Sequence, residues 1–271
     1  MSSLVSRIVF AVPLAIVALY AVWVGGWLMT GLGVVGGLIA MHEYCGMTRE
    51  LRPLTVAGFA GVAGVVIAVH RGGLVWGLAV LMAALVLAFW LSAVADVRQR
   101  ATVQLSVTLF GITWIGYGIG FLIALRDIPA SGGWGRTLLL AVLLGVWASD
   151  IFAYAGGRLI GRRKLAAEIS PNKTVEGLIV GLVMGLAVAW LVLYNQPKHD
   201  PISPLDALLV AASIAIASPV GDLFESYLKR DMGVKDTGHL LGGHGGVLDR
   251  IDALLFAGAA AYFVALALGR A

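Results

Sequence analysis

Long apolar runs separated by short polar segments form the main pattern of the chain. A membrane-crossing helix needs about 20 mostly apolar residues, because each residue adds only about 1.5 Å to its length. Runs of this kind predict nine spans, over residues 8–24, 27–45, 54–70, 74–95, 103–125, 137–157, 177–194, 206–224 and 252–268. The first run is longer than the apolar part of a usual signal peptide and lacks a convincing cleavage site, so we interpret it as a retained span. The pattern therefore predicts an all-α, polytopic integral membrane protein.

The composition agrees with this fold class. Of the 271 residues, 60% are hydrophobic and 13% are charged, whereas soluble domains carry about 25% charged residues. This balance excludes a water-soluble enzyme, a disordered chain and a nucleic-acid-binding protein. Nine spans with short connections leave no room for a separate soluble domain, so residues 1–271 are expected to form a single transmembrane domain. The single cysteine, Cys45, excludes an internal disulfide and a cysteine-based zinc site.

The distribution of lysine and arginine predicts the orientation. Cytoplasmic segments of membrane proteins carry an excess of these residues. If the N-terminus lies outside, the outer side holds five of the 19, which are Arg7, Arg71, Arg126, Arg136 and Lys198. The rest fall on the cytoplasmic side. We therefore expect the N-terminus outside and the C-terminus inside, with both strongly basic loops in the cytoplasm.

More than half of the 19 basic and 15 acidic residues lie in two segments, 150–176 and 222–252. In the second segment, a continued helix would place four polar side chains at i, i+3, i+4 and i+7 on one face, namely Asp222, Glu225, Ser226 and Lys229. Ionisable groups at membrane depth are costly and mark functional sites. The alternative is a solvated helix end with i,i+4 ion pairs.

A glycine-rich segment, 242–246, contains His244 and precedes Asp249 and Asp252 at the start of the last predicted helix. Glycines let main-chain amides approach phosphate oxygens, and a helix N-terminus attracts anions. Mg²⁺ in nucleotide-using sites binds one or two carboxylates and the substrate phosphates. Asp222 and Asp249 are the predicted metal ligands, because the intervening loop returns to the same membrane face. The alternatives are a tight turn between helices and two carboxylates that only stabilise a first helical turn.

The first charged segment offers Asp150 and Tyr154 at helical spacing, followed by Ser170, Lys173 and Thr174. Lys173 could place a cation over a phosphate. The alternative is that Thr174 caps the next helix while Glu176 complements its dipole. The basic run 162–164 could equally be a topology determinant or a contact for anionic lipids.

These segments resemble one family. The elements Ser226-x-Leu228-Lys229-Arg230, Lys235-Asp236-x-Gly238 and Leu241-Gly242-x-His244-Gly245-Gly246-x-x-Asp249-Arg250-Ile251-Asp252 are similar to the C-terminal motif of the phosphatidate cytidylyltransferases, or CDP-diacylglycerol synthases. Residues 150–177 also resemble that family's Asp-x-x-Ala-Tyr and Ser-Pro-x-Lys-Thr-x-Glu-Gly elements.

The resemblance implies Mg²⁺-dependent transfer of CMP from CTP to phosphatidate, giving CDP-diacylglycerol and pyrophosphate. It also implies a helical membrane fold, a homodimer, a second monovalent cation such as K⁺, and a site facing the cytoplasm from the inner (cytoplasmic) membrane. The expected partners are CTP, phosphatidate and membrane lipids, without nucleic acid. Residues 136–271 would then hold the catalytic helices and loops, and residues 1–135 would serve as scaffold or dimerisation helices.

Under this hypothesis the lipid phosphate attacks the α-phosphorus of CTP directly. Its second pKa is about 6, so no strong base is required. The expected catalytic residues are Asp222, Ser226, Lys229, Arg230, Lys235, Asp236, His244, Asp249 and Arg250. The expected substrate-binding residues are Asp150, Tyr154, Ser170, Lys173, Thr174 and Asp252. The basic side chains would neutralise phosphates, and Ser226 would orient a phosphate or a metal-bound water.

Two other functions fit parts of this pattern. A CTP-dependent lipid-alcohol kinase, such as a dolichol or phytol kinase, has similar motifs but would release CDP. A membrane transporter would explain charges at membrane depth without chemistry, but the chain shows no convincing internal repeat of the kind found in many transporters.

Overall fold

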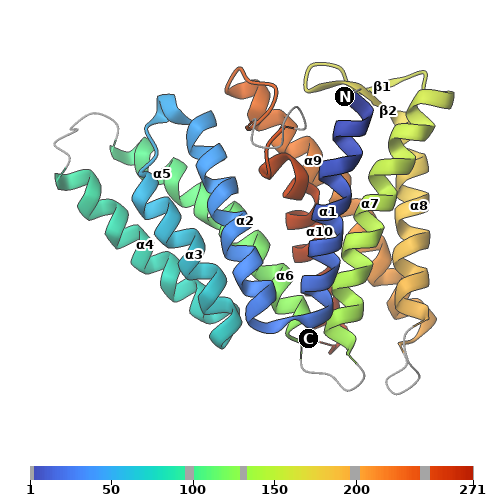
Figure 1. The fold of residues 1–271 in the computed structure, drawn as a ribbon, viewed down its shortest axis with the longest axis horizontal. Coiled ribbons are helices and arrows are strands. Elements are labelled where there is room, and N and C mark those ends of the chain that lie inside the picture. Colours follow the sequence, from blue (N-terminus) through green and yellow to red (C-terminus); the bar gives the residue numbers. More distant parts are fainter. Residues whose placement is uncertain (1–2, 95–100, 129–132, 196–201, 239–244, 271) are drawn as a thin grey trace. The chain divides into compact units, whose positions relative to one another are not determined.

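A computed structural model describes residues 3–94, 101–128, 133–195, 202–238 and 245–270, with side chains from residue 12 onward. Each of the nine predicted spans coincides with helix (Figure 1). The helices are α1 (Ser3–Val24), α2 (Gly26–Met47), α3 (Thr55–Gly72), α4 (Leu74–Val94), α5 (Ala101–Gly111), α6 (Gly118–Arg126), α7 (Trp134–Ile160), α8 (Val175–Tyr194), α9 (Pro204–Asp231) and α10 (Leu248–Ala267).

Eight helices in the described part of the chain are long and apolar enough to cross a membrane. The run from α5 through a π-helical segment, η2 (Ile112–Tyr117), to α6 counts as one of them. In α1, the part with described side chains, Val12–Val24, is apolar but shorter. The prediction of an all-α, multi-pass membrane protein is confirmed, whereas the N-out, C-in orientation stays a prediction.

Two pairs of consecutive helices are joined by a single glycine with a positive φ. Gly25, with φ 73°, separates α1 from α2, and Gly73, with φ 77°, separates α3 from α4. Residues with a Cβ rarely adopt this conformation, whereas glycine does so readily. Glycine therefore lets each of these helices end and the next begin without a longer loop. A short 3₁₀ turn, η1 (Arg49–Leu51), follows α2.

The chain divides into two compact units. Unit 1 comprises Met1–Ala124 and Met232–Ile251, and unit 2 comprises Leu125–Asp231 and Asp252–Ala271. The start of α10 thus belongs to unit 1 and the rest of that helix to unit 2. The expected division into scaffold helices (1–135) and catalytic helices (136–271) concerns function and not compactness, and it stays a prediction.

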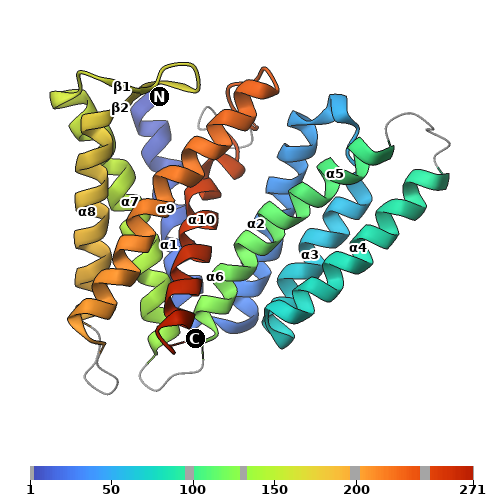
Figure 2. The same ribbon diagram turned by 180° about the vertical axis from the view of Figure 1, so that it is seen from behind.

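In unit 1, helices α2 to α5 lie side by side (Figure 2). The Tyr44 hydroxyl donates a hydrogen bond to the Val107 carbonyl at 2.9 Å, which joins α2 to α5. The Tyr44 ring also packs where a Cβ on Gly111 would lie, and Ile112 does the same at Gly61. Small residues thus allow the close helix packing that is common in membranes.

In unit 2, a short antiparallel hairpin lies at the ends of α7 and α8 (Figures 1 and 2). It consists of β1 (Lys164–Ala166) and β2 (Ser170–Thr174), with Lys164 opposite Thr174. The sequence interpretation of this segment as a loop is corrected here. The hairpin is fixed by contacts from elsewhere, since the Arg230 Nε on α9 donates to the Ile169 carbonyl at 3.1 Å.

Candidate active site

Helix α9 continues to Asp231, so the predicted polar stripe is helical throughout. The Lys229 ammonium donates to Glu225 Oε2 at 2.9 Å, as i,i+4 spacing allows. Glu225 is only 1% exposed and Lys229 is buried too. A buried ion pair is expensive to desolvate and adds little stability compared with apolar residues. The burial of this pair therefore excludes the alternative interpretation, in which these residues form a solvated helix end.

Asp222 forms an ion pair with Lys173 of β2. Their side chains are 34% and 30% exposed, so the pair is half-buried, and the Lys173 Nζ itself is buried. This contact joins the two charged segments that the sequence identified separately. A lysine predicted to bind phosphate thus lies against a carboxylate predicted to bind metal.

Asp252 on α10 completes the charged group in unit 2. It is buried, and its carboxyl group lies within electrostatic range of those of Glu225 and Asp222. Helices α9 and α10 can approach closely here because Gly221 has no Cβ. A Cβ at this position would collide with the Asp252 carbonyl.

The hairpin residues have local roles. Thr174 is the N-cap of α8, and its Oγ1 accepts a hydrogen bond from Gly177 N at 3.1 Å. The capping interpretation of Thr174 is therefore confirmed, and its contact with nucleotide stays a prediction. Glu176 Oε2 accepts from the amides of Arg162 and Arg163 at 2.9 and 3.1 Å, so it ties the end of α7 to the start of α8.

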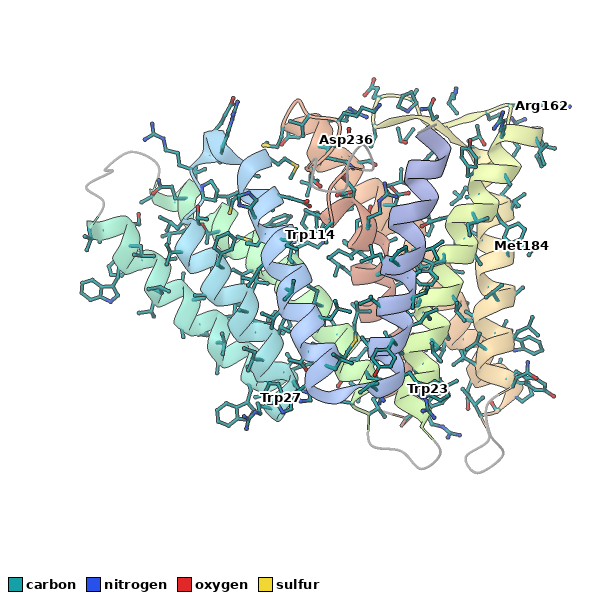
Figure 3. The ribbon with its side chains drawn as sticks, in the orientation of Figure 1. Trp23, Trp27, Trp114, Arg162, Met184 and Asp236 are labelled. Carbon is teal, nitrogen blue, oxygen red and sulfur yellow. The ribbon has the colours of Figure 1, made fainter. Side chains whose placement is uncertain are left out.

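Several predicted residues in unit 2 are open to solvent or lipid. Tyr154 is 70% exposed and Asp150 is exposed beside it on α7. Arg230 is exposed, whereas Ser170 and Ser226 are half-buried. The basic side chains of residues 162–164 are exposed as well, and Figure 3 shows Arg162 at the hairpin end of the unit. This end of unit 2 could therefore receive anionic groups.

In unit 1, Asp249 organises the loop that leads to α10. Its Oδ2 accepts hydrogen bonds from Gly246 N at 2.7 Å, Thr237 N at 3.1 Å and Thr237 Oγ1 at 2.9 Å. Lys235, Asp236 and Arg250 are exposed on the same segment, and Asp236 is labelled in Figure 3. His244 lies outside the described residues. The interpretation that Asp249 stabilises the first turn of α10 is thus consistent with its contacts.

Glu43 is a residue of this region that sequence reasoning missed. It lies within α2, is 5% exposed, and accepts hydrogen bonds from Val247 N and Leu248 N. A signal for it was present, because an ionisable residue inside an apolar span is a functional candidate. Its partners could not be identified from sequence, since they lie 204 and 205 positions away.

The two predicted metal ligands lie in different units, Asp222 in unit 2 and Asp249 in unit 1. Their coordination of a single ion stays a prediction. Within the described residues, no three His, Cys, Asp or Glu side chains gather as a metal site. Mg²⁺ bound with nucleotide needs only one or two carboxylates. The pairing of Asp222 with an ammonium group shows that this carboxylate accepts a cation, so its chemistry fits the ion.

Comparison with known proteins agrees with the motif. The model of the cytidylyltransferase family matches residues 5–268. A phosphatidate cytidylyltransferase of Brucella abortus is 35% identical, over 97% of this chain and 93% of the relative. Chloroplastic phosphatidate cytidylyltransferase 4 of Arabidopsis thaliana is 34% identical, over 96% and 73%. The Staphylococcus haemolyticus phosphatidate cytidylyltransferase is 32% identical, over 92% and 94%. With a family model that covers nearly its whole length, this chain belongs to the cytidylyltransferase family.

Proposed function

We propose that this protein is a phosphatidate cytidylyltransferase, which converts CTP and phosphatidate to CDP-diacylglycerol and pyrophosphate. The observation that carries the proposal is the family match over residues 5–268, together with relatives of that name along almost the entire chain. The lipid-alcohol kinase and the transporter are not favoured by these relatives.

The chemistry requires positioning and charge neutralisation more than proton abstraction. One oxygen of the phosphatidate phosphate forms a bond to the α-phosphorus of CTP, and the bond from that phosphorus to the β-phosphate oxygen breaks. The electron pair leaves with pyrophosphate. Because the attacking phosphate is already anionic near neutral pH, the protein has mainly to bring two anions together and stabilise the charge that develops.

Exposed cations of both units supply that neutralisation in the proposal. Arg230 in unit 2 and Lys235 and Arg250 in unit 1 are exposed, and each lies on the same segment as the predicted metal ligand of its own unit. Lys173 would move from Asp222 to a substrate phosphate, which exchanges one anionic partner for another. Ser226, one turn after Asp222, would orient a phosphate oxygen.

Mg²⁺ is the proposed cofactor, held by Asp222 and Asp249 and by the phosphates of CTP. It would withdraw charge from the nucleotide phosphates and favour departure of pyrophosphate. A second, monovalent cation such as K⁺ is part of the proposal only through the family resemblance. The same holds for a homodimer and for a site that faces the cytoplasm from the inner membrane.

The test is product analysis with the purified full chain in detergent. CTP, phosphatidate and Mg²⁺ should yield CDP-diacylglycerol and pyrophosphate in equal amounts, and omission of phosphatidate should stop pyrophosphate release. Formation of CDP with a lipid alcohol would instead identify a kinase. CTP-independent solute flux in proteoliposomes, without either product, would identify a transporter.

A further inference from the structure

Glu43 is a buried carboxylate on a membrane helix, and its two oxygens hold two different amides. An isolated carboxylate in such a place is costly unless donors surround it. Val247 N donates to Oε1 at 2.9 Å, and Leu248 N donates to Oε2 at 2.8 Å. Each oxygen of the carboxylate is therefore used at the start of α10.

These two amides are groups that a helix cannot satisfy by itself. Leu248 is the first residue of α10, and the first N–H groups of a helix lack internal partners and carry partial positive charge. A capping side chain usually comes from the residue just before its helix. Here it comes from α2, so that helix sets the position and direction in which α10 starts within unit 1.

Two glycines of the motif make room for this carboxylate. A Cβ on either Gly238 or Gly246 would lie closer than 3.0 Å to an oxygen of Glu43. Neither glycine has a positive φ, so backbone conformation does not require glycine at these positions. Their identity is explained by close contact with Glu43, which lies far away in the sequence.

Thr237 links the carboxylates of Glu43 and Asp249. Its hydroxyl lies 2.9 Å from Asp249 Oδ2 and 3.4 Å from Glu43 Oε2. A hydroxyl has one proton to donate, and the shorter contact assigns it to Asp249. Glu43 thus fixes the start of α10, while Asp249 binds that start to Thr237.

We propose that Glu43 is a positioning residue for cytidylyl transfer: it holds Asp249 in the orientation that meets the metal-bound nucleotide. This inference rests on the proposed function, because the role of Asp249 is defined by that reaction. Glu43 acts through the amides of Val247 and Leu248 and through Gly238 and Gly246. It does not contact substrate in this role.

The test is Glu43→Gln in the full chain. The substitution keeps the side-chain shape, but its NH₂ group must face one of the two amide donors, so a hydrogen bond to a charged group is lost. Hydrogen exchange at Val247 and Leu248 should become about tenfold faster. The Mg²⁺ concentration for half-maximal pyrophosphate release should rise by about the same factor, with the KM for phosphatidate unchanged. A purely structural role would not separate these two parameters.

Glu50→Gln is the matched control, because Glu50 lies in η1 just after α2 and is exposed. It should leave exchange and Mg²⁺ dependence as in the wild type. If Glu43→Gln does not fold, Glu43→Asp keeps the charge, shortens the reach and should give a smaller change in the same direction.

Unchanged exchange at Val247 and Leu248 in the folded variant would overturn the proposal. Faster exchange with wild-type Mg²⁺ dependence would also overturn it, because Glu43 would then only stabilise the fold. Absence of CTP-dependent pyrophosphate release by the wild type would overturn the proposed function instead, and the exchange experiment would still report on the Glu43 contacts.

Discussion

The carboxylates of Asp222 and Asp249, the two predicted metal ligands, are stabilised by different kinds of partner. Asp222 in unit 2 faces the ammonium group of Lys173 at a partly exposed position. Asp249 in unit 1 accepts hydrogen bonds from the uncharged donors of Thr237 and Gly246. One carboxylate is held by an opposite charge, and the other by fixed dipoles.

The difference has a chemical consequence. An ammonium group on a flexible lysine can be exchanged for another cation, because the side chain can rotate away from its partner. Main-chain amides are fixed by the fold and cannot leave. Asp222 is therefore suited to change partners during binding, whereas Asp249 is suited to stay in place. Both properties are useful at a site where a metal arrives with its substrate.

The largest expected effect is on turnover. Asp222→Asn and Asp249→Asn should each lower the rate of pyrophosphate release by roughly 10⁴-fold, because a metal ligand that stabilises developing charge contributes several kcal/mol. Asp231→Asn is the control, since Asp231 is exposed at the end of α9. Normal turnover by both folded variants would refute the metal assignment.

The next effect is on stability and concerns the buried pair beside Asp222. Lys229→Met leaves Glu225 buried without its ammonium partner, which should cost about 3 kcal/mol of unfolding free energy. Adding Glu225→Gln removes the uncompensated charge and should restore most of the loss. Thermal unfolding in detergent measures both variants. A double variant as unstable as the single one would show that the pair is not the source of the cost.

The sequence predicted those features that depend on residues close together in the chain, and it did not predict those that depend on distant ones. The nine spans depend on apolar runs, which are local, and each run forms helix. The stripe on α9 depends on helical spacing, and Glu225 and Lys229 meet as that spacing predicts. Its burial was not predictable, because the residues that cover it, such as Asp252 next to Gly221, come from a different helix, α10.

The hairpin and Glu43 show where local patterns fail. Strands β1 and β2 have three and five residues, and polar strands this short give no alternation to read. Contacts from other elements reach the ends of the hairpin: Arg230 donates to the Ile169 carbonyl between the strands, and Glu176 accepts from the Arg162 amide just before β1. Glu43 lies within a predicted span, but its partners, Val247 and Leu248, are more than 200 residues away in the sequence. Contacts of this kind become visible only in the folded chain.

The smallest expected effect tests whether Asp222 changes partners. Lys173→Met removes the ammonium group from Asp222 and, in the proposed mechanism, from a substrate phosphate. Mg²⁺ should then bind a few-fold more tightly without nucleotide, because it no longer has to displace the ammonium group from Asp222, while the KM for CTP should rise. Direct titration with Mg²⁺ and steady-state kinetics measure the two changes.

The informative result is that Lys173→Met should strengthen Mg²⁺ binding but weaken the interaction with CTP. A lysine that only stabilised the hairpin would weaken both interactions or neither. Lys164→Met is the matched control, because Lys164 is exposed on β1 of the same hairpin and faces Thr174 across the strands. It should change neither value. Weaker Mg²⁺ binding in Lys173→Met would mean that Lys173 helps to position Asp222 for the metal, so that the carboxylates of Asp222 and Asp249 would both be held in place for binding.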